Sequence, residues 1–206
     1  MMSSVRFFHS ITIPVPHDHI YRRLGKKNGM VWSEGMRHDE VEADIASACA
    51  LMRLQGALKR MDVTLSGTSG IRLESGHAFE SARLAAYLEG CGEVLLMAAT
   101  GGRDIVESIK RGMEQGDMTR SVVFDAVASE MVDAALDWFC DMFNHELIRE
   151  GKRLKKSRFS AGYGDFSLRE QKTIYDLLQL SHLGVDITDY YMLIPEKTVT
   201  AVAGIR

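Results

Sequence analysis

Residues 93–100 have the sequence EVLLMAAT, an apolar run rich in Val, Leu and Ala. An apolar run of this length and composition, bounded by turn residues, predicts a buried β-strand. Gly101 and Gly102 follow it and interrupt the apolar pattern. A helix is expected next, over residues 104–114.

The longest helix is predicted over residues 117–149. Asp117 follows a glycine and is a good N-cap, and Gly151 is a typical residue to end a helix. Apolar residues recur along this segment at helical spacing and predict one buried stripe, made of Val123, Val127, Met131, Ala134, Trp138 and Met142.

The remaining segments alternate between helical and extended patterns. Helical spacing predicts helices over residues 17–24, 37–60 and 75–88, and Ser167 to Glu170 form a capping box that opens a further helix ending near Gly184. Residues 26–35 are predicted to be a loop. Alternating residues predict a hairpin over 62–73 and two strands over 186–205, hinged at 195–197.

This order of elements lacks a βαβα rhythm and a G-x-G-x-x-G motif. It therefore predicts an α+β fold with an antiparallel twisted sheet, built from residues 62–73, 93–100 and the C-terminal strand pair. We expect residues 1–36 to form an N-terminal arm with a short helix, and residues 37–206 to form the α+β domain.

Composition excludes several classes of protein. The net charge of −3 does not indicate a nucleic-acid-binding protein or a membrane-surface protein. The apolar runs have strand length, and no signal peptide is recognised at the N-terminus. The three cysteines, Cys49, Cys91 and Cys140, are widely spaced and favour a reducing compartment. We therefore expect a cytoplasmic protein.

One loop contains the residues best suited to binding a ligand. Residues 158–165 have the sequence RFSAGYGD and follow a basic run. Arg158 can bind a carboxylate through two parallel hydrogen bonds, Gly162 lets the backbone approach a ligand, and Tyr163 offers an aromatic face. A zwitterionic amino acid attached to a nucleoside would need these groups. The alternative from composition is a linker between two helices with a surface arginine.

Other polar groups are given structural interpretations. His17 and His19 lack a third ligand and are interpreted as a polar helix start. Cys91 and Cys140 are interpreted as core thiols. Acidic residues at helical spacing are interpreted as a solvated helix face, made of Glu130, Asp133, Asp137 and Asp141.

Residues 158–163 resemble the activation domain of cobalamin-dependent methionine synthase. That family has an arginine, two variable residues, proline, glycine and tyrosine, and here Arg158, Gly162 and Tyr163 match while Ala161 stands in the place of the proline. The resemblance continues through the helix and strands that follow, and upstream along residues 126–143. There Asp133 occupies the position of a family glutamate near the ligand.

The resemblance implies a module that binds S-adenosylmethionine, with Arg158 on the ligand's carboxylate, Ala161, Gly162 and Tyr163 beside it, and Asp133 in support. The family uses S-adenosylmethionine, with an electron donor such as a flavodoxin-like protein, to remethylate an oxidised cobalamin. No D-x-H-x-x-G motif for a cobalamin ligand occurs here. The cobalamin is therefore expected on a partner, a methionine synthase or related corrinoid methyltransferase that lacks its own activation domain.

Two alternatives remain open. The family's N-terminal acidic residue for the ligand's amino group has no clear counterpart in this sequence. A binding or scaffold protein of a corrinoid methyltransferase system, without the S-adenosylmethionine site, is the first alternative to an accessory subunit. An independent small-molecule methyltransferase is the second.

Overall fold

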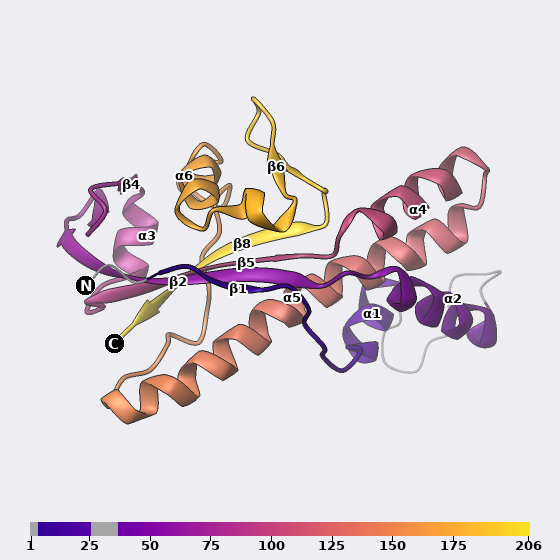
Figure 1. Cartoon of the computed structure of the whole chain (residues 1–206), viewed down its shortest axis with the longest axis horizontal. Helices are drawn as coiled ribbons and strands as arrows, with labels where there is room; N and C mark the ends of the chain where they lie inside the picture. Colours follow the sequence, from indigo (N-terminus) through magenta and orange to yellow (C-terminus); the bar gives the residue numbers. More distant parts are fainter. Residues whose placement is uncertain (1–3, 26–36) are drawn as a thin grey trace.

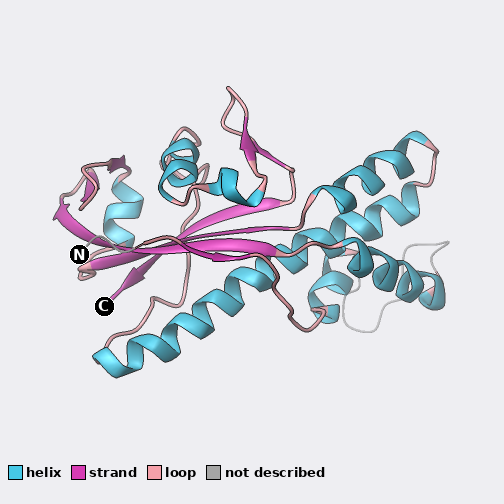
Figure 2. Cartoon of the chain, in the orientation of Figure 1, coloured by secondary structure: helices cyan, strands magenta, loops and turns pink. Residues whose placement is uncertain are grey.

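A six-stranded antiparallel sheet forms the centre of the computed structural model, which describes residues 4–25 and 37–206 (Figures 1 and 2). Five strands follow one another across the sheet: β4 (Ala78–Glu80), β3 (Gly70–Leu73), β2 (Gln55–Ser66), β5 (Glu93–Thr100) and β8 (Thr198–Ile205). The sixth strand, β1 (Arg6–Phe8), pairs with β2. The predicted α+β class with an antiparallel sheet is confirmed.

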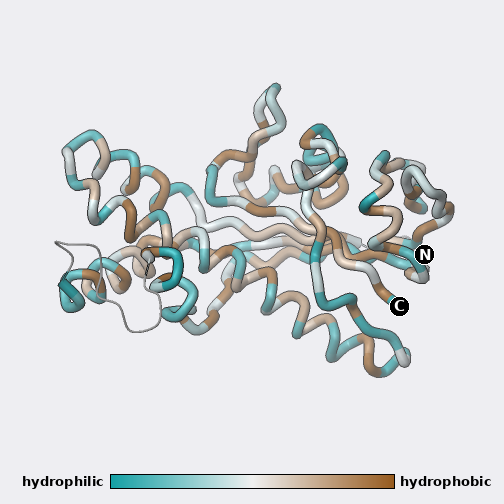
Figure 3. The backbone as a smooth tube through the Cα atoms, turned by 180° about the vertical axis from the view of Figure 1, so that it is seen from behind, coloured by the Kyte–Doolittle hydropathy of each residue, from teal (hydrophilic) through white to brown (hydrophobic). Residues whose placement is uncertain are grey.

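The central strand β5 has the predicted bounds and is buried on both faces because it pairs with β2 and β8 and helices cover the sheet. Alternate residues of a strand point to opposite faces, and β5 therefore contributes to two hydrophobic cores. Leu95, Met97 and Ala99 join the core under α5, whereas Val94, Leu96 and Ala98 join the core under α3 and α6. Figure 3 shows hydrophobic and hydrophilic positions alternating along the helices that cover the sheet.

Helix α5 (Met118–Leu147) crosses one face of the sheet diagonally, and α4 (Arg103–Glu114) packs beside its first half (Figure 1). The predicted N-cap is confirmed, since the Asp117 side chain accepts a hydrogen bond from the Arg120 N–H. A 3-10 turn, η1 (Ile148–Glu150), ends at Gly151. Within the described residues, no helix combines the length and apolarity needed to cross a membrane.

The buried face of α5 differs from the predicted stripe in its second half. Ala134, Trp138 and Met142 are only partly buried, and the fully covered positions are Ala135, Phe139 and Phe143. In the second half of α5, each predicted buried position is therefore one residue before the observed one. Trp138 instead lies against Phe8 of β1, with the rings edge to face at a centroid distance of 5.6 Å.

The N-terminal helices are α1 (His17–Arg23) and α2 (His38–Leu51), and both pack against α5. The predicted loop over 26–35 lies outside the described residues. The prediction that helix 37–60 continues past residue 51 is wrong. Met52 is extended, and β2 begins at Gln55 because β1 and β5 pair with its first half. The predicted hairpin is the second half of β2 joined to β3.

The predicted helix over 75–88 is also too long. Residues 78–80 form β4 and pair with β3, and the helix is only α3 (Ala82–Tyr87). Ser81 separates the two elements, because its extended backbone cannot continue a helix and its hydroxyl caps the Leu84 N–H.

The capping box does not form as predicted. The helix after the glycine-rich loop, α6 (Glu170–Leu177), begins later, and the Glu170 carboxylate accepts from the Thr173 hydroxyl instead of reaching back to residue 167. The Ser167 hydroxyl accepts from the Arg169 N–H. A separate 3-10 turn, η2 (Leu180–Leu183), precedes the left-handed residue Gly184.

The C-terminal segment forms three strands instead of two. β6 (Asp186–Ile187) and β7 (Leu193–Ile194) pair only with each other in a small ribbon above the sheet (Figure 1), and β8 alone joins the main sheet. The prediction that a C-terminal pair belongs to the main sheet is therefore corrected to one strand.

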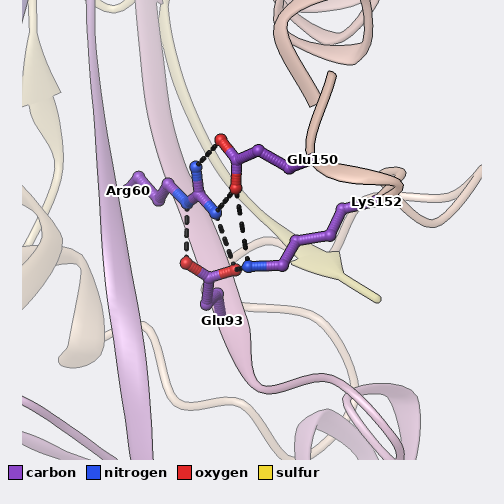
Figure 4. A network of polar contacts seen from close by, with 4 residues as sticks. All are labelled: Arg60, Glu93, Glu150 and Lys152. Atoms are coloured by element: carbon purple, nitrogen blue, oxygen red, sulfur yellow. Dashed lines mark hydrogen bonds and ion pairs between the residues drawn. The ribbon is translucent and has the colours of Figure 1, made fainter. Parts of the chain in front are cut away.

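A four-residue polar network fixes the chain where it leaves α5 (Figure 4). The Arg60 guanidinium donates to Glu93 at 2.7 Å and to Glu150 at 2.7 and 2.5 Å. The Lys152 ammonium donates to Glu93 at 2.7 Å. These contacts join the end of α5 to β2 and β5, and they set the path of the basic segment that follows.

This network is expected to make stability depend on pH in the acid range. The hydrogen bond from Arg60 lowers the pKa of Glu93, and it lowers the pKa of Glu150 from 4.5 to about 2. A carboxylate whose pKa is lower in the folded state adds stability above its unfolded pKa and loses it as pH falls through the folded value. The difference in unfolding free energy between wild type and Arg60→Gln should therefore be full above pH 4.5 and shrink towards pH 2.

Urea unfolding at a series of pH values measures this difference. Arg72→Gln, at an exposed position of β3, is the matched control and should show no such change with pH. A difference between wild type and Arg60→Gln that stays constant from pH 7 to about pH 2 would contradict the assigned role of the network.

Candidate functional site

A cleft of about 620 Å³ lies between α5 and the outer edge of β8. Small-ligand sites generally occupy roughly 300–1,000 Å³, so this cleft is large enough for a nucleoside that bears an amino-acid chain. Its walls combine polar and apolar side chains from α5 (Asp133, Leu136, Asp137), residues 156–161, Tyr163, Gln171 and residues 198–200 of β8.

The segment after α5 runs along the outer edge of β8. Arg153 and Arg206 exchange two backbone hydrogen bonds, and Phe159 and Val202 exchange two more, at 2.9 and 2.7 Å. Neighbouring residues of an extended segment point to opposite sides. The Phe159 ring therefore packs beside Phe166 in one core, while the Arg158 side chain reaches the opposite side, where it meets α5.

Beyond Phe159 no described segment pairs with the outer edge of β8, although Thr198 and Thr200 are themselves buried. Thr198 and Thr200 direct their backbone groups to the same side as Val202, because alternate residues of a strand bond to the same neighbour. Within residues 4–25 and 37–206, no backbone hydrogen bond occupies that side of these two threonines. The Thr200 hydroxyl donates to the Gln171 amide oxygen at 2.6 Å. The cleft wall thus offers both backbone and side-chain polar groups.

The glycine loop forms a compact turn at the mouth of the cleft. Gly162 has φ +89°, which favours glycine, and its N–H donates to the Phe166 carbonyl at 2.7 Å. Ala161 and Tyr163 line the cleft, and Tyr163 is 71% exposed. Gly162 itself supports the turn and is not part of the cleft wall.

Asp165 anchors this turn to a distant part of the chain. Its carboxylate accepts from the Ser81 hydroxyl at 2.6 Å and from the Ala82 N–H at 2.8 Å, at the start of α3. The hydrogen bond from Ser81 lowers the pKa of Asp165. The loop is therefore held at both ends, by β8 before residue 160 and by α3 at residue 165.

Arg158 faces two carboxylates of α5. Its guanidinium donates a hydrogen bond to Asp137, and a second guanidinium nitrogen lies 4.0 Å from an Asp133 oxygen. The Arg158 side chain is 21% exposed, whereas those of Asp133 and Asp137 are 58% and 62% exposed. The arginine is thus the least exposed of these three residues, and the two carboxylates lie at the solvent side.

The electrostatic environment differs between the members of this triad. Burial raises the pKa of Asp133, and nearby Arg158 acts in the opposite direction. Burial acts to lower the pKa of Arg158, but the hydrogen bond and the charge of Asp137, together with the contact with Cys140, outweigh it, so the pKa is raised overall. With both carboxylates ionised, Arg158, Asp133 and Asp137 together have a net charge of −1, which Lys156 on the cleft wall offsets. The cleft therefore offers both signs of charge, which favours a zwitterionic ligand.

The structure therefore brings four of the five predicted site residues to one cleft: Asp133, Arg158, Ala161 and Tyr163. Asp137 was missed because it was grouped with a solvated acidic face. Asp137 is exposed as that interpretation predicts, at 62%, but it also binds Arg158. The interpretation is wrong for Glu130, whose side chain is 14% exposed and binds Arg23. Gln171 was also missed, since its contact with Thr200 depends on how α6 packs over β8.

The other candidates lie elsewhere. His17 and His19 approach different carboxylates, Glu42 and Glu130. Residues 4–25 and 37–206 contain no cluster of three side chains suited to hold a metal ion. Cys91 is buried as predicted, while Cys140 is only partly buried, and burial raises the pKa of both thiols.

Comparison with solved structures gives a likeness at the level of fold. The crystal structure of the MetH reactivation domain bound to AdoHcy (S-adenosylhomocysteine) matches with a TM-score of 0.64 and 15% identity, over 98% of this chain and 78% of that chain. No protein-family model and no curated protein sequence matches the chain. The chain therefore has the fold of a MetH-type reactivation domain.

Proposed function

We propose that this chain is an S-adenosylmethionine-binding accessory module for reductive reactivation of a cobalamin-dependent methyltransferase. This proposal rests on the cleft between α5 and β8. In a fold shared with a domain that was crystallised with AdoHcy, Arg158, Ala161 and Tyr163 line a cleft of suitable size beside two carboxylates. AdoHcy is a close analogue of S-adenosylmethionine.

Each part of the ligand has a chemical counterpart in the cleft. Arg158 is suited to the carboxylate, because a guanidinium pairs with it in a charge-assisted hydrogen bond. Asp133 is suited to the sulfonium. Tyr163 presents an exposed ring against which a base can stack, and the open edge of β8 offers backbone donors and acceptors to the nucleoside.

The partner in this proposal is a methionine synthase or related corrinoid methyltransferase that holds the cobalamin and lacks its own reactivation domain. The chain would bind and orient S-adenosylmethionine for this partner. The partner's cobalamin, once reduced by an electron donor such as a flavodoxin-like protein, would accept the methyl group, and S-adenosylhomocysteine would remain. The isolated chain is then not an enzyme by itself, and the cytoplasm is where such a system would operate.

The carboxylate of Asp133 predicts a preference for S-adenosylmethionine over S-adenosylhomocysteine. S-adenosylmethionine has a sulfonium charge that S-adenosylhomocysteine lacks, and partly exposed charge pairs contribute about 0.2–1 kcal/mol. We therefore expect S-adenosylmethionine to bind about 1.5- to 5-fold more tightly, and this preference to shrink in Asp133→Asn. Calorimetric titration of both ligands at low and high salt measures it. Equal affinities in wild type at low salt would contradict the assignment of Asp133.

Reactivation tests the function directly. A cobalamin-dependent methionine synthase truncated before its own reactivation domain should regain activity when this chain, S-adenosylmethionine and a reducing system are added together. Omission of any one component should abolish the recovery. If the chain binds no S-adenosylmethionine yet forms a complex with the methyltransferase, the scaffold function takes the place of this proposal.

A further inference from the structure

The arginine proposed to hold the ligand already has a carboxylate partner. Arg158 donates to Asp137, and Asp133 lies one helical turn earlier at 4.0 Å from the same guanidinium. All three residues line the cleft, together with Lys156. A ligand carboxylate that takes the Nη1 and Nη2 atoms of Arg158 therefore has to displace Asp137 or share the guanidinium with it.

Displacing Asp137 has a different cost for different ligands. An anionic ligand that pairs with Arg158 leaves Asp133 and Asp137 without a positive partner. These two residues lie four positions apart on α5, and like charges at that spacing repel. A zwitterionic ligand supplies an ammonium group in the same step. That ammonium can pair with the released carboxylate, so the number of ion pairs is conserved.

We propose that Asp137 is a specificity-determining residue that admits to the cleft only ligands with both a carboxylate and an adjacent cation. Asp137 binds Arg158 when the cleft is empty, and it binds the ligand's ammonium when the cleft is filled. This inference rests on the proposed function and adds to it the residue that selects the α-amino-acid head group. It also assigns a residue to the ammonium group.

The test compares two ligands that differ only at that group. S-adenosylhomocysteine and its deaminated analogue, in which hydrogen replaces the ammonium, are titrated by calorimetry into wild type, Asp137→Asn and Asp141→Asn. Asp141 is exposed, lies one turn further along α5 and is not part of the cleft wall. Asp141→Asn therefore removes the same charge from the same helix as Asp137→Asn does. Thermal unfolding confirms that all three proteins are folded.

Wild type should prefer S-adenosylhomocysteine over the deaminated analogue by about 1.5- to 5-fold, the size expected for one partly exposed ion pair. In Asp137→Asn this preference should disappear, mainly because the analogue binds more tightly once Arg158 has lost the Asp137 carboxylate as a partner. Asp141→Asn should keep the wild-type ratio.

Three other outcomes are informative. If wild type binds S-adenosylhomocysteine and Asp137→Asn leaves the ratio unchanged, the role of Asp137 is overturned while the proposed function survives. If wild type binds neither ligand but Asp137→Asn binds the analogue, the role of Asp137 is supported and the proposed function of the wild-type chain fails. If no protein binds either ligand, both are overturned.

Discussion

Replacing Arg158 with alanine is expected to weaken S-adenosylmethionine binding by about 10- to 150-fold. A hydrogen bond that involves a charged group contributes about 1.5–3 kcal/mol, and this loss in binding free energy corresponds to that range of affinities. Arg158 is 21% exposed, so its contact with a ligand carboxylate would be partly shielded from water. Calorimetric titration of wild type and variant measures the loss.

Arg149→Ala is the matched control for Arg158→Ala. Arg149 is exposed on the 3-10 turn after α5, outside the cleft, and its loss should leave the affinity unchanged. Removing Arg158 also frees Asp137, so both variants need to be shown folded by circular dichroism. Equal affinities of wild type and Arg158→Ala would place the ligand at another site.

The largest effect on stability is expected from Phe139→Ala. Phe139 is fully buried on α5, and its ring packs against Phe8 at a centroid distance of 5.1 Å. A Cβ added at Gly56 of β2 would lie 2.7 Å from the ring, which shows how closely the helix approaches the sheet here. Truncating a buried phenylalanine costs about 3–5 kcal/mol of unfolding free energy, since it leaves a cavity.

Urea unfolding of Phe139→Ala and Val122→Ala distinguishes this packing from a general effect of shortening side chains on α5. Val122 is 46% exposed on the same helix, and its replacement should change stability by less than about 0.5 kcal/mol. A loss below about 1 kcal/mol for Phe139→Ala would contradict the central packing of α5 on the sheet.

The elements that could be predicted from the sequence are those whose local pattern agrees with their final packing. The run at residues 93–100 is apolar at nearly every position because β5 is covered on both faces. The capping aspartate and the terminal glycine of α5 are local signals, and they fix its ends wherever the helix packs.

The errors occur where tertiary pairing decides the structure. Leu54 and Leu58 have helical spacing, yet Leu58 lies in β2, which pairs with β1 and β5, and Leu54 lies just before this strand. Gly56 has no local signal for its role, since the reason for the missing side chain is Phe139, which is far away in the sequence. Local propensity is a weak guide when pairing of this kind outweighs it.

The candidate site shows the same division. Arg158 and Tyr163 could be predicted from a short motif, because their positions follow from consecutive residues. Asp137 could not, because its meeting with Arg158 requires the chain to turn back after α5 and run along β8 beside that helix. The network of Arg60, Glu93, Glu150 and Lys152 helps to hold this return path in place (Figure 4).

A crystal structure of the chain grown with S-adenosylmethionine tests the central claim most directly. The account predicts the ligand in the cleft between α5 and β8, with its carboxylate within about 3.2 Å of the Arg158 guanidinium and the contact between Arg158 and Asp137 broken. A ligand bound elsewhere, or one whose carboxylate points to solvent while Arg158 still holds Asp137, would contradict it.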